Sequence, residues 1–188
     1  MSATNRGAVR NEADFYVTPR KTVDLILNEI SDSHYRYAQI LEPCAGNGAI
    51  VKALREWFSS STITANEIRR EERNSLFESG ADYVVNCDFI KPNTLGSNYD
   101  LIITNPPYSI AQEIIEHCFK IAPDAEVIML LRLGFLESQK RREFWERHPL
   151  TQLYPLLKRP SFTGKGTDAT AYGWFVWSKY RKPLIKPI

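Results

Sequence analysis

The segment Asn105-Pro106-Pro107-Tyr108 combines residue types that can act together on a planar amino group. The lone pair of such an amine, for example the exocyclic amine of adenine, is delocalised into its ring. A catalyst must therefore accept hydrogen bonds from the amine protons. The side-chain oxygen of Asn105 and the carbonyl of Pro106 are suitable acceptors, and two prolines fix the turn that presents them. The ring of Tyr108 offers a stacking surface.

A turn with two glycines, residues 42–48, is a second candidate site. It reads Glu-Pro-Cys-Ala-Gly-Asn-Gly and follows a short apolar run. Gly46 and Gly48 allow a sharp bend and let a ligand approach backbone amides. The third glycine of the dinucleotide fingerprint is missing, which disfavours a pyrophosphate cradle, whereas Glu42 favours a cationic group. Taken alone, the turn is equally compatible with a strand-to-helix connection that binds nothing.

Two further acids follow short apolar runs in the same way. Glu67, followed by Ile68, can accept hydrogen bonds from both hydroxyls of a ribose. Asp88 offers an acceptor beside the ring of Phe89, which suits the amino group and flat face of an adenine. Either acid alone is more often only solvated. With Glu42 there are three such acids, which makes coincidence a weaker explanation.

These candidate residues need a scaffold that brings the ends of several apolar runs together. Apolar residues recur at helical spacing in some segments and form short buried runs in others, and the two kinds alternate. The expected helices cover residues 19–30, 50–58, 70–79, 110–122 and 138–148. The expected strands cover residues 37–41, 63–65, 83–85, 100–104, 127–131, 153–156 and 172–177.

This alternation predicts an α/β fold with a single-domain, doubly wound and mostly parallel sheet of seven strands, because parallel neighbours need crossover helices. Ligands of such sheets bind beyond the carboxyl ends of the strands, near the switch point in strand order. The candidate residues all follow strands, so we expect them to meet at that edge. Residues 1–14 lack hydrophobic periodicity and are expected to form a flexible arm ahead of the domain, residues 15–188.

Composition sets broad limits on function. A chain of 188 residues with 43% hydrophobic content is enough for one core, and the net charge of +2 is too small to indicate nucleic acid by itself. Three cysteines without a Cys-x-x-Cys pair argue against a disulfide framework or a structural zinc site. No apolar run approaches membrane-spanning length, so we expect no membrane association and a cytoplasmic location.

Together, these motifs resemble the S-adenosylmethionine-dependent amino methyltransferases, most closely the small DNA adenine methyltransferases of phage and prophage type. The similarity covers nearly the whole chain, and the motifs occur in the family's order. It implies a Rossmann-like class I methyltransferase fold, S-adenosylmethionine as the cofactor, DNA as the partner and, for a phage-encoded chain, the host cytoplasm as the location. The implied reaction moves the methyl group of the cofactor to the exocyclic amino group of adenine in DNA.

The resemblance also implies roles for individual residues. The catalytic motif is Asn105, Pro106, Pro107 and Tyr108. The cofactor-binding residues are Tyr16, Thr18, Pro19, Glu42, Pro43, Cys44, Ala45, Gly46, Gly48, Glu67, Ile68, Asp88 and Phe89. Among them, the residues before the first helix contact the methionine end, Glu67 the ribose, and Asp88 with Phe89 the adenine. No metal is implied.

Three residues are candidates for contact with the substrate. Phe162 lies in a glycine-rich segment between the last two strands, where the family places an aromatic residue that stacks on the flipped base. Lys165 in the same segment and Arg141 on the polar helix 138–148 are candidates for phosphate contacts. The simpler interpretations are a hairpin loop packed on the core and a solvated charged face.

Several alternatives stay open at this stage. Planar, poorly nucleophilic nitrogens also occur in RNA bases and in protein glutamine, so an RNA base or a glutamine side chain is an alternative acceptor. An inactive, methyltransferase-like nucleic-acid-binding subunit is a further alternative. A nicotinamide-dependent oxidoreductase would leave the Asn-Pro-Pro-Tyr segment unexplained. No separate target recognition domain is expected, so the target sequence is not predicted, and the chain is expected to be a monomer or a weak dimer.

Overall fold

The computed structural model describes residues 17–31, 37–91, 95–162 and 169–188. The predicted arm, residues 1–14, lies outside these residues. The α-helices are α1 (Arg20–Ser31), α2 (Ala49–Trp57), α3 (Arg73–Glu78), α4 (Ala111–Ile121) and α5 (Arg142–Arg147). The 3-10 helices are η2 (Arg70–Glu72), η3 (Tyr108–Ile110), η4 (Leu133–Leu136) and η5 (Gln139–Arg141). The strands are β1 (Gln39–Glu42), β2 (Thr62–Asn66), β3 (Tyr83–Val85), β4 (Leu101–Thr104), β5 (Glu126–Arg132), β6 (Gln152–Pro155), β7 (Tyr172–Trp177) and β8 (Leu184–Ile185).

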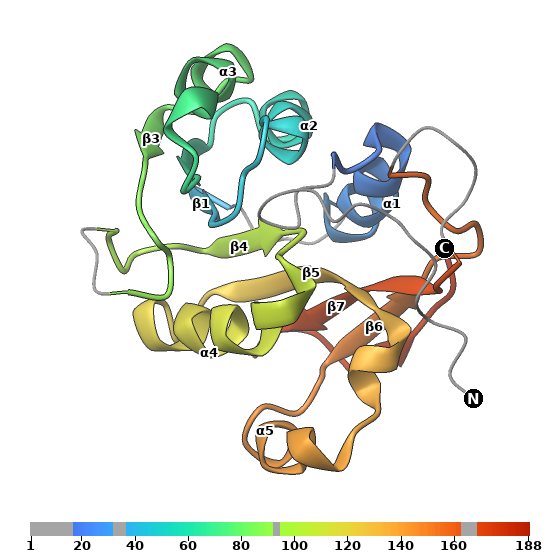
Figure 1. Cartoon of the computed structure of the whole chain (residues 1–188). Coiled ribbons are helices and arrows are strands. Elements are labelled where there is room, and N and C mark those ends of the chain that lie inside the picture. Colours follow the sequence, from blue (N-terminus) through green and yellow to red (C-terminus); the bar gives the residue numbers. More distant parts are fainter. Residues whose placement is uncertain (1–16, 32–36, 92–94, 163–168) are drawn as a thin grey trace.

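Within the described residues, the strands form one mixed sheet in the order β3-β2-β1-β4-β5-β7-β6-β8 (Figure 1). The strands from β1 to β5 are parallel, and β7 is inserted antiparallel between β5 and β6. Because β1 lies between β2 and β4, the strand order reverses there, and the switch point lies at the carboxyl ends of β1 and β4. The predicted α/β class and mostly parallel sheet are confirmed.

Helices cover both faces of the sheet (Figure 1), and each face has its own apolar core. On β4, Leu101 and Ile103 contribute to the core beneath α1 and α2, while Ile102 contributes to the core beneath α4. This alternation follows from the period of two along a strand. All four residues of β4 are buried because both faces are covered. The residues that follow β4 are therefore held by a strand that is fixed from both sides.

The number of strands is a correction: the described sheet contains eight strands, one more than predicted. The additional strand β8 has two residues, pairs in parallel with β6 and is exposed. A run this short has no buried alternation that could reveal it. The predicted helices 70–79 and 138–148 are also each divided into a 3-10 turn and a short α-helix. Before α5 the backbone of Ser138 has a φ of 115°, and its hydroxyl accepts a hydrogen bond from the Lys140 amide, which starts a separate turn.

A buried polar network lies at the amino end of β5, where the strand begins with Glu126. This carboxylate accepts hydrogen bonds from the Tyr37 hydroxyl at 2.7 Å and from Nε of Arg181 at 2.6 Å. The Arg181 guanidinium also donates to the Tyr37 oxygen at 2.9 Å. Burial raises the pKa of Tyr37, so its hydroxyl stays protonated. The network joins the C-terminal segment to the sheet edge opposite the strand tips that carry the candidate residues.

We predict that Glu126→Ala lowers the free energy of unfolding by about 3 to 5 kcal/mol, because the variant leaves the Arg181 cation buried without its counter-ion. The matched control is Asp124→Ala, which removes an ion pair with Lys179 whose two side chains are exposed. That control should have no measurable effect. Urea denaturation of both variants checks the difference, and equal losses of stability would contradict a structural role for the network.

Candidate active site

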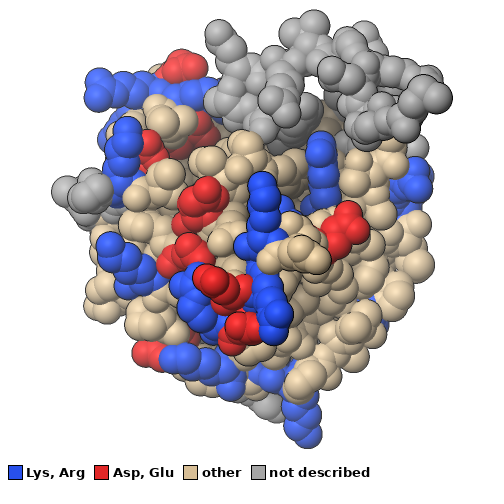
Figure 2. Space-filling view, turned by 60° about the horizontal axis from the view of Figure 1, so that its bottom comes forward, with Lys and Arg blue, Asp and Glu red and all other residues tan. Residues whose placement is uncertain are grey.

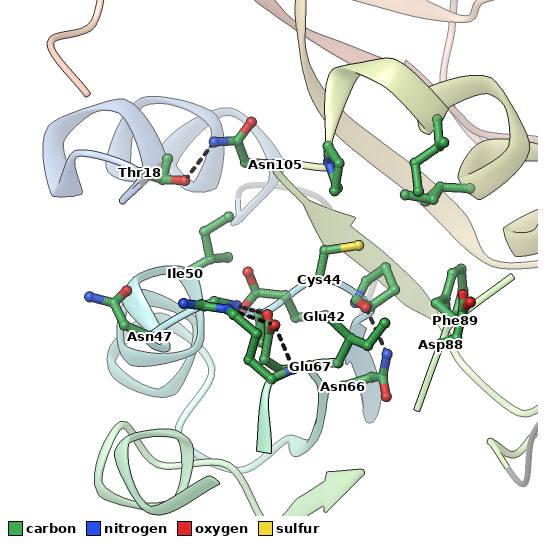
Figure 3. Close-up of a pocket in the computed structure, with 18 of the residues that line it drawn as sticks. Thr18, Glu42, Cys44, Asn47, Ile50, Asn66, Glu67, Asp88, Phe89 and Asn105 are labelled. Carbon is green, nitrogen blue, oxygen red and sulfur yellow. Dashed lines mark hydrogen bonds and ion pairs between the residues drawn. The ribbon is translucent and has the colours of Figure 1, made fainter. Parts of the chain in front are cut away.

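The predicted site residues gather around one cavity of about 430 Å³ at the carboxyl ends of β1, β2, β3 and β4 (Figure 3). Twelve of them line it: Thr18, Glu42, Pro43, Cys44, Ala45, Gly46, Glu67, Ile68, Asp88, Phe89, Asn105 and Pro107. The volume lies within the range of roughly 300 to 1,000 Å³ that is usual for small-molecule sites. The topology therefore brings together segments that are far apart in the sequence.

The glycine turn after β1 forms the floor of the cavity. Gly46 has a φ of 55°, a left-handed conformation that suits glycine, and its amide donates to the Glu67 carboxylate at 2.7 Å. Gly48 has a φ of 85° and does not line the cavity. A side chain at Gly48 would collide with Ser79. The second glycine thus permits the close approach of α3 to the start of α2, while the first faces the cavity.

Asn66, the last residue of β2, ties three strand ends together. Its amide nitrogen donates to the carbonyl oxygens of Pro43, after β1, and Cys87, after β3, at 3.0 and 3.2 Å. Its amide oxygen accepts from the Cys87 backbone N–H at 3.2 Å, and its own carbonyl accepts from the Ala45 amide at 2.9 Å. The side chain is only 1% exposed. These bonds fix the spacing between the segments that carry the three strand-end acids.

Glu67 lies at the centre of the cavity wall and is 6% exposed. One carboxylate oxygen accepts from the Gly46 amide, and the other accepts from the backbone N–H and Nε of Arg69 at 3.0 and 3.1 Å. Arg69 also pairs with Glu72 at 3.1 Å and lines the cavity. The oxygen that accepts from the Gly46 amide keeps a second lone pair, with which the carboxylate can accept from a ligand hydroxyl.

Glu42 is the most deeply buried acid of the site, at 1% exposure. Burial raises its pKa well above the ordinary value, the backbone amide of Val51 opposes the shift, and the nearby Glu67 adds to it. Its Oε2 has no hydrogen-bond partner among the described residues. A buried acceptor without a donor is costly, and this cost is removed when a ligand supplies a donor or a positive charge. The cavity thus offers a place for a cationic or donor group beside Glu42.

Asn105 follows β4 and closes the cavity on the side of α1. Its amide nitrogen donates to the Thr18 hydroxyl at 3.1 Å, and its amide oxygen accepts from the Tyr108 hydroxyl at 2.9 Å. Figure 3 shows the oxygen pointing away from Thr18. A carbonyl oxygen can accept a second hydrogen bond. The amide is therefore held in one orientation from both ends and still has one lone pair available.

Some predicted residues lie behind or outside the cavity. Pro19 precedes α1, where its carbonyl accepts from the Thr22 amide, and Pro106 is buried behind the turn. Tyr108 lies on the far side of Asn105, packed against both cores. Tyr16 and Lys165 lie outside the described residues.

The two described candidates for substrate contact lie away from the cavity. Phe162 packs edge-to-face on Tyr172, with ring centroids 5.2 Å apart, and Tyr172 packs on Tyr108 at 5.7 Å. Phe162 thus belongs to an aromatic group that reaches the catalytic motif. The Arg141 guanidinium lies over the Phe135 ring and donates to the Glu137 carbonyl at 2.8 Å. Its contacts therefore hold the η4 turn, and a phosphate contact stays a prediction.

Sequence reasoning missed several lining residues. The apolar ones, such as Ile50 and Ile114, belong to the apolar faces of predicted helices. Helical periodicity shows that such a face is buried, but it does not show that the end of the face reaches a cavity. Asn66 carried a signal, since a polar residue that ends an apolar strand needs a partner. Arg69 gave no distinctive signal. The complete set is Val17, Asn47, Ala49, Ile50, Asn66, Arg69, Cys87, Ile90, Ser109, Ile110 and Ile114.

In the described part of the chain, no cluster of three or more His, Cys, Asp or Glu side chains is arranged to hold a metal ion. No helix in these residues has the length and apolar character needed to cross a membrane.

We predict that Glu42→Gln stabilises the free protein relative to wild type, increasingly so as the pH rises above the ordinary glutamate pKa of 4.5. Above that pH the unfolded state loses the Glu42 proton while the folded state retains it, so the wild type loses stability as the pH rises. Glutamine has no proton to lose. Thermal unfolding of both proteins between pH 4 and 8 checks this, and a difference in melting temperature that is constant with pH would contradict it.

Known proteins give information on the fold alone. No family model and no curated protein sequence matches this chain. Among solved structures, a Pyrococcus horikoshii protein assigned as an RNA methyltransferase is similar with a TM-score of 0.71 and 17% identity, over 89% of this chain and 88% of that one. A Listeria monocytogenes protein assigned as a class I S-adenosylmethionine-dependent methyltransferase is similar with a TM-score of 0.71 and 13% identity, over 96% of this chain and 68% of that one.

A third similar structure, an S-adenosylmethionine-dependent O-methyltransferase from Thermotoga maritima, gives a TM-score of 0.63 and 15% identity, over 89% of this chain and 68% of that one. At such identities the likeness concerns architecture. The chain therefore has the Rossmann-like fold of the class I S-adenosylmethionine-dependent methyltransferases, as the resemblance of its motifs implied.

Proposed function

We propose that this chain transfers the methyl group of S-adenosylmethionine to the exocyclic amino group of adenine in DNA. One observation carries the proposal. The Asn105 amide, held between Thr18 and Tyr108, lies at the cavity that also contains the strand-end acids Glu42 and Glu67. An acceptor for amine protons and a pocket with the features of a cofactor site are thus joined in one place.

The lining of the cavity fits S-adenosylmethionine group by group. Glu42, with its buried oxygen that has no partner among the described residues, suits the ammonium of the methionine end. Glu67 can accept from the ribose hydroxyls. Asp88 can accept from the adenine amino group between the apolar side chains of Ile68 and Phe89. When bound, S-adenosylmethionine supplies an electrophilic methyl group on a sulfonium.

Asn105 would act on the acceptor amine. Its remaining lone pair can accept a hydrogen bond from an amine proton, which directs the amine toward the cavity and draws electron density to the nitrogen. The Thr18 contact keeps the amide nitrogen, a donor, away from the amine. Transfer forms an N–C bond and breaks the S–C bond, and one amine proton is released to solvent.

A nucleobase suits the acceptor side because a group of aromatic rings includes and adjoins the catalytic motif. Tyr108 lies next to Asn105, and Tyr172 and Phe162 continue the aromatic group. Base-on-aromatic stacking is worth roughly 1 to 3 kcal/mol and offsets much of the cost of extruding a base from a duplex. A glutamine side chain would make little use of these rings.

The charged face that includes α5 gives little support for binding of nucleic acid to a broad basic surface. Figure 2 shows basic and acidic side chains interspersed on this face. On α5, Arg142 pairs with Glu146 at 2.9 Å, and Arg147 pairs with Glu116 of α4 at 3.0 Å. Contacts close to the target base should therefore provide more of the affinity than this surface does.

RNA is the second candidate acceptor, since the aromatic group would serve an RNA base equally well and one similar structure is assigned as an RNA methyltransferase. The test is incubation with methyl-labelled S-adenosylmethionine and separate duplex DNA, single-stranded DNA, RNA and protein. We expect label in DNA, identified as N6-methyladenine after digestion. Label in RNA alone or in protein alone would show that this polymer, and not DNA, is the acceptor. If folded protein binds the cofactor but transfers no label, the chain is an inactive subunit.

We predict that Asn105→Ala lowers kcat at least a hundredfold and leaves affinity for S-adenosylmethionine within about threefold, because the lost acceptor acts mainly on the amine in the transition state. Asn28→Ala, the same change at an exposed position of α1, is the matched control and should change neither quantity. Steady-state kinetics and calorimetry measure the two effects. An Asn105 variant that keeps most of its turnover would exclude the proposed role.

We predict that Phe162→Ala reduces methyl transfer to duplex DNA with little change in melting temperature, because the half-buried ring is expected to stack on the extruded base. A ring that only supports the core would instead cost stability, by up to about 3 to 5 kcal/mol for a fully buried phenylalanine. Thermal unfolding and 2-aminopurine fluorescence in the target position separate the two roles. Normal turnover combined with a large loss of stability would remove Phe162 from the site.

A further inference from the structure

Arg132 ends β5 and lies against Tyr108 of the predicted catalytic motif. In the sheet, Met129 of β5 pairs with Thr104, the last residue of β4, so Arg132 lies three residues beyond the point where β4 ends. On its other side Arg132 pairs with Tyr172 of β7. The register therefore places this cation beside the turn that begins with Asn105.

The Arg132 side chain lies over the ring of Tyr108. Its guanidinium carbon is 5.0 Å from the ring centroid, and its Nε donates to the Tyr172 hydroxyl at 3.3 Å. A planar cation on an aromatic face is a favourable arrangement. The hydroxyl of the same Tyr108 donates to the Asn105 amide oxygen. One aromatic ring thus joins Arg132 to the acceptor for the target amine.

One face of the Tyr108 ring is covered by the side chain of Arg132. Tyr108 packs against both cores, and Tyr172, its aromatic neighbour, is 1% exposed. Arg132 itself is exposed. Moving Arg132 breaks its contacts with Tyr108 and Tyr172, whereas moving the buried neighbours would disturb the cores. A base that stacks on Tyr108 must therefore displace the guanidinium.

We propose that Arg132 is a positioning residue that exchanges places with the target base. In the free protein it covers the stacking face of Tyr108; in the complex it moves aside and binds a phosphate of the target nucleotide. The guanidinium suits both positions, because it stacks on aromatic rings and also binds phosphate oxygens through two parallel hydrogen bonds. This inference rests on the proposed function, since it requires a nucleotide acceptor.

The proposed exchange predicts two opposite effects of Arg132→Ala, namely weaker binding of duplex DNA and tighter binding of free deoxyadenosine. Loss of a phosphate contact should raise KM for duplex DNA about tenfold, with kcat changed less than threefold. The slope of log affinity against log salt should become shallower by about 0.9, as for one phosphate contact. Deoxyadenosine has no phosphate and competes with Arg132 only for the ring. With the cofactor cavity saturated by S-adenosylhomocysteine, the variant should bind deoxyadenosine several-fold more tightly, as measured by NMR titration.

Two further variants separate positioning from structural and bulk charge effects. Arg132→Lys keeps the charge and should retain the salt slope of the wild type. Arg142→Ala removes a cation that pairs with Glu146 on α5, and it should leave KM, salt slope and deoxyadenosine binding unchanged. All variants should melt within about 2 °C of the wild type, because the two arginines are exposed.

The results distinguish failure of this inference from failure of the proposed function. Wild-type protein that methylates DNA, together with an Arg132→Ala variant of unchanged KM and salt slope, overturns the role of Arg132 and leaves the function intact. Weaker binding of deoxyadenosine by that variant overturns the exchange. Wild-type protein that places no label in DNA overturns the function, and the role of Arg132 with it.

Discussion

The site depends on one buried amide, the side chain of Asn66. Three parallel strands end beside one another, and their last carbonyl and N–H groups have no further strand partners there. Asn66 accepts from one such N–H group and donates to two such carbonyls, so that the segments after β1, β2 and β3 keep a fixed separation. Pro43 follows Glu42, Asn66 precedes Glu67 and Cys87 precedes Asp88, so the tie joins the segments that carry the three acids. The spacing of the acids is a property of the sheet edge rather than of any one loop.

A second consequence of the same edge concerns the catalytic motif. The β4 strand, buried on both faces, places Asn105 next to the tied segments, and Thr18, just before α1, contacts it from the other side. Two prolines restrict the turn, and Tyr108 completes the hydrogen bonds of the amide. The acceptor is thus oriented before any ligand is bound. Preorganisation of this kind avoids reorganisation during the reaction.

Much of this arrangement was predictable from the sequence because it depends on local patterns. Alternating strand and helix signals predicted the sheet, and residues directly after strands were expected at one edge, where the structure places them. The exposed two-residue β8 escaped prediction because no burial pattern marks it. Arg69 carried no distinctive signal, and Arg132 escaped because its place depends on strand register and side-chain direction. These are set by long-range pairing, such as that of Arg132 with Tyr172, which spacing along the chain does not encode.

The central claim is that the strand-end cavity binds S-adenosylmethionine and presents its methyl group toward Asn105. A crystal structure of the protein with this cofactor tests the claim most directly. We expect the ribose hydroxyls within hydrogen-bond distance of Glu67, the methionine ammonium beside Glu42 and the methyl group on the side of the cavity lined by Asn105. A cofactor bound elsewhere on the protein, or bound in this cavity with its methyl group directed away from Asn105, would contradict the claim.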